Sequence, residues 1–256
     1  MRIRSLALQT ELALAATRGT VTDRGDYIVI ATPDDPGYYY GNLLVLPAAP
    51  QVGEVAYWTR RFGDELGKNP AIGHVTFWWD GVTGDAGATD ELAAAGFSIE
   101  RSMVMTAEPG DVASATPPLP IRALAADEVI ATAKLAYEVG DRHDETFRTF
   151  VERRAAWGRS LVERGLATFY AAFDGDQPIA SLGLVRLGDI ARFQDVQTLE
   201  PYRGRGIATS LLAAAAANTS TRLAIVAQGG SAGERVYERA GFVTAELTVS
   251  ACRYPA

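Results

Sequence analysis

Several residue types that point directly to a particular chemistry are scarce in this chain. Its 256 residues include one cysteine, Cys252, and two histidines, and no apolar run is long enough to cross a membrane. A single thiol excludes an intrachain disulfide, so we expect a buried, apolar Cys252 in a protein of a reducing compartment. His74 and His143 stand apart, and no cluster has metal-ligand spacing. We therefore expect no metal site.

Positive charge is also in deficit. The chain has 24 Lys and Arg residues against 31 Asp and Glu residues, which gives a net charge of −7. This balance argues against a nucleic-acid partner and is compatible with a cationic amine as substrate. The composition, 48% hydrophobic and 21% charged, is that of a globular chain with room for one large domain or two ordinary ones.

Residues 1–19 carry some features of an export signal, with Arg2 and Arg4 ahead of leucines and alanines. Such a signal needs a continuous apolar core, and the sequence Gln-Thr-Glu at 9–11 interrupts it. The leucines at helical spacings predict an amphipathic first helix instead. We expect a cytoplasmic protein with no membrane partner.

Residues 191–217 combine a strand, a glycine-rich turn and a helix. The strand 191–198 is followed by Pro201, which cannot continue a β-ladder, and by Arg-Gly-Arg-Gly at 203–206. The alanine-rich stretch 207–217 predicts a helix. Unpaired N–H groups and the helix dipole favour an anion at such an N-terminus, and glycines let a phosphate approach the backbone. The sequence therefore predicts an anion-binding site.

Three known types of glycine-rich loop could fit this turn. A Walker loop ends in Gly-Lys-Ser/Thr, which is missing. A dinucleotide-binding loop needs an acidic residue after the next strand, whereas strand 223–227 is followed by Gln228. The remaining pattern, Arg203-x-x-Gly206-x-Ala208, resembles the pyrophosphate-binding motif Q/R-x-x-G-x-G/A of the GNAT superfamily of acyl-CoA-dependent N-acyltransferases.

A second motif supports this resemblance. The sequence Glu-Arg-Val-Tyr-Glu-Arg-Ala-Gly-Phe at 234–242 is similar to the family's closing signature, and one strand separates the two motifs, as in the family. The resemblance covers residues 118–256. It implies an α/β (α+β) fold with a mixed, centrally splayed β-sheet flanked by helices. The expected helices are 127–139, capped by Asp127, 145–163, the helix after 206, and 232–240, and the expected strands are 121–124, 167–173, 179–187, 191–198, 222–227 and 242–250.

The proline- and glycine-containing stretch 107–120 is predicted to be a linker between domains 1–106 and 121–256. Within the first domain, Glu-Leu-Ala-Ala-Ala-Gly-Phe at 91–97 echoes the closing signature. The first domain therefore resembles a degenerate second GNAT copy, with an unrelated α/β domain as the alternative. Residues 47–53 lack the pyrophosphate motif and Leu92 takes the place of Tyr237, so this copy is not expected to bind acyl-CoA.

Other patterns of the first domain give local predictions. We expect strands at 27–31, 71–79 and 97–106, an extended run at 38–46, and a short helix at 88–95. A helix over 51–66 is predicted to bury Val52, Val55 and Phe62, together with either Trp58 or Tyr57. The three tyrosines at 38–40 are expected to pack between the units, with a recognition wall as the alternative.

The resemblance implies acetyl-CoA as co-substrate and no metal. Main-chain N–H groups of 204–209 would hold the diphosphate, and strand 196–198 would offer main-chain groups to the pantetheine arm. Arg203 and Arg205 would add charge, with a solvated side chain as the alternative for either. Gly230 stands where the family often has asparagine, so Ser231 is the candidate to replace it. The implied cofactor-binding residues are Val196, Gln197, Thr198, Arg203, Gly204, Arg205, Gly206, Ile207, Ala208, Thr209 and Ser231.

The resemblance also assigns Tyr237 as the general acid that protonates or hydrogen-bonds the leaving thiolate, and a space-filling core tyrosine is the alternative. Arg192 stands where many members have a glutamate as base. Asp195 is the candidate base, with deprotonation through solvent as the alternative. His143 and Asp144 are candidate acceptor contacts, or else a solvated loop.

These observations predict a tandem GNAT-like protein whose second domain transfers an acyl group, with acetyl expected, to a primary amine of a small molecule or peptide. Because no Cys or Ser constellation indicates a covalent intermediate, we expect direct attack. A non-catalytic acyl-CoA sensor is the alternative from another class, and a thiol or hydroxyl acceptor stays open. A monomer or homodimer is expected.

Overall fold

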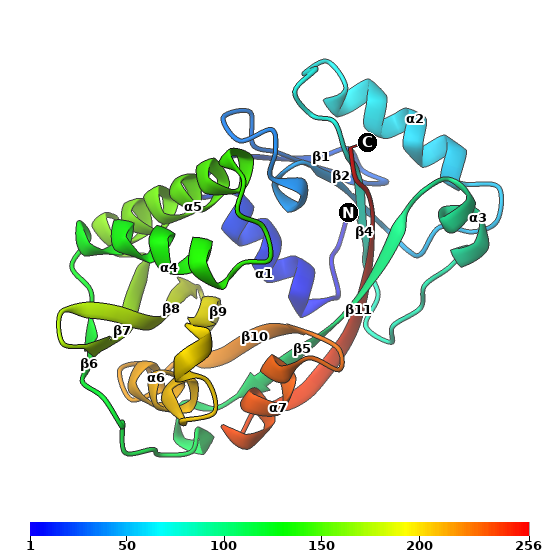
Figure 1. The fold of residues 1–256 in the computed structure, drawn as a ribbon. Coiled ribbons are helices and arrows are strands. Elements are labelled where there is room, and N and C mark those ends of the chain that lie inside the picture. Colours follow the sequence, from blue (N-terminus) through cyan, green and yellow to red (C-terminus); the bar gives the residue numbers. More distant parts are fainter. Residues whose placement is uncertain (256) are drawn as a thin grey trace. The chain divides into compact units, whose positions relative to one another are not determined.

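The computed structural model describes residues 1–255, in two compact units (Figure 1). The first unit is Met1–Val104 together with the chain from Thr244 onward, and the second is Met105–Val243. Both boundaries between the units fall within a strand. β5 (Ser98–Ala107) is divided after Val104, and β11 (Val243–Arg253) is divided after Val243. The first unit is therefore completed by the last strand of the chain.

The first unit is built on a mixed sheet with the strand order β1-β2-β3-β4-β11-β5. β3 and β4 are parallel, and β4 pairs antiparallel with β11. All four residues of β3 are buried, as expected for an interior strand next to a parallel neighbour. The remaining elements are β1 (Thr20–Asp23), β2 (Ile28–Ala31), β3 (Leu43–Leu46), β4 (Val75–Trp79), α1 (Leu6–Ala15), α2 (Val55–Leu66) and α3 (Thr89–Ala94).

Helix α1 is capped by a residue from the far end of the chain. Its N-cap residue, Ser5, makes no capping bond with its own side chain to the helix amides. The Glu246 carboxylate on β11 instead accepts hydrogen bonds from the Leu6 and Ala7 amides, at 2.9 and 3.4 Å, and from the Ser5 hydroxyl at 3.0 Å. A carboxylate at a helix N-terminus also complements the helix dipole. The start of the first unit thus depends on its last strand.

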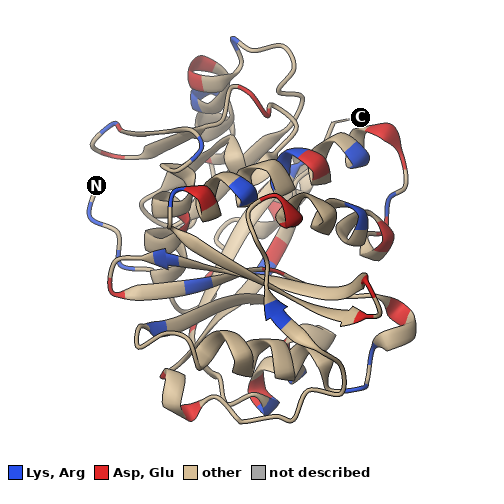
Figure 2. Ribbon diagram, turned by 90° about the vertical axis from the view of Figure 1, so that its left-hand side faces the viewer, with Lys and Arg blue, Asp and Glu red and all other residues tan. Residues whose placement is uncertain are grey.

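The second unit has the strand order β10-β9-β8-β7-β6, with helices on both sides of these strands (Figures 1 and 2). Helices α4 and α5 pack against one face and α6 against the other. Figure 2 shows that acidic and basic residues alternate along the helices. The elements are β6 (Ile121–Ala123), α4 (Thr132–Val139), α5 (Glu145–Glu163), β7 (Ala167–Asp174), β8 (Gln177–Leu187), β9 (Ile190–Thr198), α6 (Ile207–Ala216), β10 (Arg222–Gln228) and α7 (Ala232–Arg239).

Strand β9 is the centre of the second unit. It runs parallel to β10, but the paired residues extend only from Ile190 to Arg192, so the two strands part before β9 ends at Thr198. On its other side β9 pairs with β8, where the register shifts between Ser181 and Gly183. Asp195 lies in this bulge with a positive φ of 52°. The predicted mixed and centrally splayed sheet is confirmed.

Several local predictions were wrong. Residues Tyr39–Gly41 form a 3-10 turn rather than a strand. Helix α2 begins at Val55, so Val52 lies outside it and is 87% exposed. Asp127 makes no side-chain capping bond and precedes a 3-10 turn, with helix α4 starting only at Thr132. Strand β1 was missed.

The predicted burial of three α2 residues and of Cys252 is confirmed. Val55, Trp58 and Phe62 are buried on α2. Cys252 is fully buried and accepts a hydrogen bond from the Thr76 hydroxyl at 3.2 Å. Within residues 1–255, no helix is both long and apolar enough to span a lipid bilayer.

The compact units differ from the predicted domains in where the last strand belongs, because β11 pairs with β4 of the first unit. The predicted linker is also partly ordered against the second unit, since the Ala113 amide donates to the Ala240 carbonyl at 2.9 Å. The division into a degenerate GNAT-like domain 1–106, a linker 107–120 and a GNAT domain 121–256 stays a prediction.

Candidate functional site

The turn between β9 and α6 is shaped by two glycines. Gly204 and Gly206 have φ values of 75° and 77°, a left-handed conformation that side chains with a Cβ rarely adopt. Gly206 is the N-cap residue of α6, and no side chain caps that helix. A Cβ at either glycine would meet no atom within 4 Å, so the space above this backbone is open. The first amides of α6 are therefore available to a ligand.

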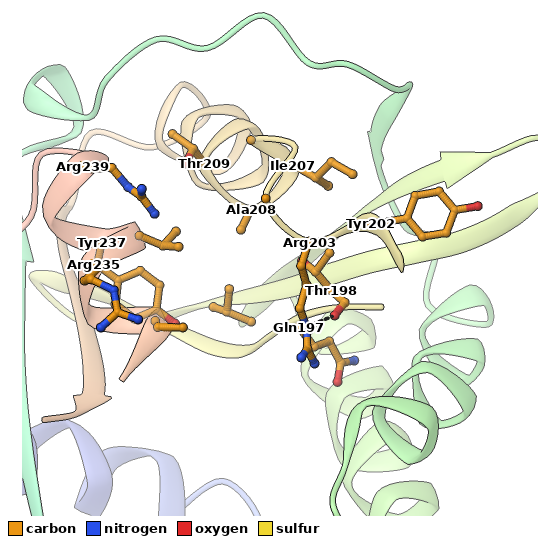
Figure 3. Close-up of a pocket in the computed structure, with 16 residues that line it drawn as sticks. Gln197, Thr198, Tyr202, Arg203, Ile207, Ala208, Thr209, Arg235, Tyr237 and Arg239 are labelled. Atoms are coloured by element: carbon orange, nitrogen blue, oxygen red, sulfur yellow. Dashed lines mark hydrogen bonds between the residues drawn. The ribbon is translucent and has the colours of Figure 1, made fainter. Parts of the chain in front are cut away.

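These amides border a cavity of about 550 Å³, within the size range of cofactor sites (Figure 3). Its walls come from the end of β9, the turn, the start of α6, and α7. The lining residues are Val196, Gln197, Thr198, Tyr202, Arg203, Gly204, Gly206, Ile207, Ala208, Thr209, Ala232, Gly233, Arg235, Val236, Tyr237 and Arg239.

Most of the predicted cofactor residues line this cavity, with two exceptions. Arg205 does not line it; its guanidinium lies 5.2 Å from the centre of the Tyr202 ring. Ser231 is used as the N-cap of α7, where its hydroxyl accepts a hydrogen bond from the Glu234 amide at 3.2 Å. The structure therefore brings the turn, strand β9 and Tyr237 together, and leaves Arg205 and Ser231 outside.

Sequence reasoning missed two cations of the cavity. Arg235 and Arg239 lie one helical turn apart on α7 and line it opposite Arg203 (Figure 3). Arg203 donates from Nε to the Thr198 carbonyl at 3.1 Å, which ties the turn to the end of β9. Guanidinium groups and free helix amides form a donor set that suits phosphate oxygens. The i, i+4 spacing of the two α7 arginines was the signal available in the sequence.

Tyr237 is held between the cavity and the core of the second unit. It is 8% exposed, and its ring packs edge-on against Phe242 at 6.4 Å. Burial raises the pKa of its phenol to about 12. The hydroxyl is therefore protonated throughout the neutral pH range, and within the described chain no hydrogen bond to it is found. It is available as a donor to a ligand in the cavity.

Asp195, the predicted base, lies outside this cavity. It lines a second cavity of about 200 Å³ between α4, α5 and β9. Its carboxylate accepts a hydrogen bond of 2.6 Å from Nε of Arg154 on α5. Gln197 lines both cavities, so they meet at β9. Strand alternation and the bulge thus place Asp195 on the side of this strand that faces α4 and α5.

The other candidate polar residues have structural partners. Asp144 caps α5 by accepting from the Phe147 amide at 2.8 Å. His143 packs its ring against Tyr137 at 5.2 Å, and neither residue lines the second cavity. Arg192 is 6% exposed on β9. Among residues 1–255, no group of three or more His, Cys, Asp or Glu residues is placed to hold a metal ion.

The aromatic residues of the first unit are packed within it. The Tyr40 hydroxyl donates to Glu100 at 2.7 Å, and Tyr39 packs edge-on against Tyr254 at 5.3 Å. Leu92, the counterpart of Tyr237 in the predicted repeat, is fully buried. These contacts lie within the first unit, whereas packing between the units was expected. They favour packing over a recognition wall for Tyr39 and Tyr40.

Comparisons with known proteins indicate the family to which residues 126–251 belong. The model of the acetyltransferase (GNAT) domain matches residues 126–251. A GCN5-related N-acetyltransferase from Kribbella flavida has a similar structure, with a TM-score of 0.69 at 14% identity over 100% of this chain and 98% of that chain. A functionally unknown conserved protein from Staphylococcus epidermidis gives a TM-score of 0.78 at 13% identity over 93% and 95%.

A tandem GNAT protein from the clavulanic acid biosynthesis pathway also matches, with a TM-score of 0.53 at 12% identity, over 97% of this chain and 94% of that chain. At such identities these structures show a shared fold alone. No curated protein sequence matches this chain. The match of the family model includes both sequence motifs, the pyrophosphate turn and the Tyr237 signature, and residues 126–251 therefore belong to the GNAT family of acetyltransferases.

Proposed function

We propose that the second unit is an acyl-CoA-dependent N-acyltransferase that transfers acetyl from acetyl-CoA to a primary amine. The observation that carries this proposal is the 550 Å³ cavity at the uncapped N-terminus of α6, lined by three arginines and by Tyr237. In the reaction, the amine attacks the thioester carbonyl, a C–N bond forms, and the C–S bond breaks. The family supports acetyl transfer from acyl-CoA, and the amine acceptor and the roles of single residues are the proposal.

The residues present fit a diphosphate. Backbone amides at the start of α6 supply neutral donors, and the open space above Gly204 and Gly206 admits phosphate oxygens close to the chain. Arg203 and the two arginines of α7 would balance the charge. Binding at this turn would place the rest of the cofactor along β9.

The exposed edge of β9 suits the pantetheine arm. Beyond Arg192 this edge has no ladder partner in β10, so its main-chain groups are free to pair with an extended amide-containing chain. The Thr198 carbonyl is already an acceptor for Arg203. Val196, the first residue of β9 that lines the cofactor cavity, is therefore the candidate to offer main-chain groups to this arm.

Tyr237 would act as a hydrogen-bond donor to the thioester sulfur of acetyl-CoA, which becomes the leaving thiolate. A thiol of the cysteine type has a pKa of about 8.5, well below the value of about 12 for this phenol. Full proton transfer to the thiolate would cost several kcal/mol at about 1.4 kcal/mol per pKa unit. Charge stabilisation by the hydroxyl, with the proton supplied from solvent, is the more favourable path.

The test compares Tyr237→Phe with Tyr170→Phe, another tyrosine that is nearly fully buried in the second unit but does not line the cavity. We expect Tyr237→Phe to lower kcat for release of CoA from acetyl-CoA by about 100-fold and to leave the Kd of CoA within a factor of two. Tyr170→Phe should change neither. Equal turnover in both variants would contradict the proposed role.

A second candidate function is acyl-CoA sensing without turnover. It is favoured by two observations: the cavity lining includes no carboxylate, and Asp195 is engaged by Arg154. Deprotonation by Asp195 or through solvent is required for catalysis, and a sensor needs neither. Tight CoA binding without acetylation of any amine in a broad panel would favour the sensor.

We propose that the first unit is a degenerate copy that does not bind acyl-CoA. Its support is sequence-based: the missing motif after β3, where prolines remove backbone donors, and Leu92 in place of the tyrosine. Titration calorimetry with CoA should give one site per chain. Two sites would contradict this assignment.

A further inference from the structure

The second cavity of the second unit has a chemistry of its own. It lies between α4, α5 and β9 and shares Gln197 with the cofactor cavity. Its walls are predominantly apolar and include the rings of Phe147, Phe150 and Phe169. Its polar groups are gathered toward β9, where Asp195 and Gln197 lie.

The aromatic wall is a built feature rather than a loose surface. Phe147 stacks between Tyr137 and Phe150, with ring centres 6.0 and 6.1 Å apart. Gly140 makes room for this stack, because a Cβ there would lie 2.4 Å from the Phe147 ring. Phe147 and Phe150 remain half-buried. A ligand that covers these ring faces would gain the free energy of apolar burial.

The polar end carries one charge of each sign, and they are paired. Nε of Arg154 donates to Asp195 at 2.6 Å, and Nη2 donates to the Gln194 side chain at 2.9 Å. The Arg154 and Asp195 side chains are 18% and 26% exposed. Arg154 is therefore committed and does not offer a counter-ion to an anionic ligand. A carboxylate can accept several hydrogen bonds, so Asp195 keeps capacity for an amine N–H.

The size of the cavity limits the ligand. About 200 Å³ corresponds to roughly seven water-sized volumes, and therefore to an organic group of about ten non-hydrogen atoms. A carboxylate on such a group would be desolvated beside Asp195 without a free cation, which is strongly unfavourable. An amine at the polar end would lie beside Gln197, where the two cavities meet.

We propose that this second cavity is the acceptor site and that it selects a primary amine carried on a compact, uncharged apolar group about the size of a phenyl ring. This inference rests on the proposed acyltransferase function. Phe147 and Phe150 bind the apolar group, and Asp195, positioned by Arg154, accepts a hydrogen bond from the amine.

The experiment compares phenylethylamine with phenylalanine, which has the same ring and amine plus a carboxylate, and with a lysine-containing peptide. With acetyl-CoA and the full-length protein, we expect kcat/KM for phenylethylamine to exceed that for each of the others at least tenfold. Calorimetry on the CoA complex should show phenylethylamine binding. Preference for phenylalanine or for the peptide would overturn the inference and leave the proposed function standing.

A cavity-filling variant tests the location. Ala136→Phe, on the half-buried wall formed by α4, should reduce phenylethylamine turnover more than tenfold with the Kd of CoA unchanged. Ala156→Phe, at an exposed position of α5, is the matched control and should retain full turnover. If Ala136→Phe does not fold, Phe150→Ala should raise the KM for phenylethylamine at least tenfold. Unchanged kinetics in the folded variants would overturn the site.

The two possible failures are distinguishable. Loss of CoA binding by the wild-type protein would remove the proposed function and this inference with it. Intact CoA binding, without either binding or acetylation of phenylethylamine, would overturn the acceptor assignment alone.

Discussion

Replacing Gly206 by alanine would separate a backbone effect from a ligand effect. Gly206 has a φ of 77°, and a Cβ there would meet no protein atom within 4 Å. Gly188, in the turn between β8 and β9, has a φ of 74° and equally open surroundings, but it lies outside the cofactor cavity. Alanine at either position should cost about 1–2 kcal/mol of stability, or about 2–8 °C in Tm.

The two variants should differ in their affinity for CoA. At Gly206 the new methyl group would stand over the amides that hold the diphosphate, and losing one hydrogen bond to a charged group costs about 1.5–3 kcal/mol. The Kd of CoA should therefore rise about 10- to 150-fold in Gly206→Ala and stay unchanged in Gly188→Ala, as measured by titration calorimetry. Wild-type affinity in a folded Gly206→Ala protein would refute the assignment of this turn.

Three further predictions concern single groups. Burial raises the pKa of Tyr237 from 10 to about 12, so the folded state keeps this proton to higher pH than the unfolded state, and the associated stability is lost as the pH rises through that interval. In denaturant titrations at alkaline pH, the free energy of unfolding should therefore fall less with pH for Tyr237→Phe than for wild type. An identical fall in both proteins would contradict the raised pKa. Cys252, whose burial raises its pKa, should react with a thiol reagent only upon unfolding, and rapid labelling of the native protein would contradict its burial. Glu246→Gln should lower the free energy of unfolding by about 1–3 kcal/mol, because the charge at the start of α1 is lost, and an unchanged denaturation midpoint would show that the cap is dispensable.

The second unit was largely predictable because its signals are local. Its helices have clear periodicity, and the glycines of the pyrophosphate turn are needed for their φ values wherever that turn occurs. The position of Tyr237 was also predictable, because its motif places it on a short helix before Gly241. The order of elements and the mixed sheet followed from these features.

The first unit was less predictable because side-chain hydrogen bonds decide its local structure. Tyr39 and Tyr40 have high β-propensity, yet the chain turns there because the Asn42 side chain bonds the Asp35 and Tyr38 carbonyls, at 2.9 and 3.0 Å. Its Oδ1 also accepts from the Thr32 amide at 2.9 Å. Such a side-chain network leaves no periodic trace in the sequence.

The position of Asp195 depends on the bulge in β9. Simple alternation places it opposite Val196, but it does not show that its partner would be Arg154 from α5. The arginines of α7 were not predicted, although their i, i+4 spacing is visible in the sequence. Their place in the cavity follows from the helix period once α7 is set beside α6.

The placement of β11 in the first unit has a consequence for synthesis of the protein on the ribosome. The first unit cannot complete its sheet, or cap α1 with Glu246, until the last strand has been made. At about 5–20 residues per second, residues 105–256 take on the order of 10–30 s, and during that time residues 1–104 lack the strand between β4 and β5. The second unit is continuous in sequence and can fold during this interval. The half of the chain that is made first is therefore the half that becomes native last.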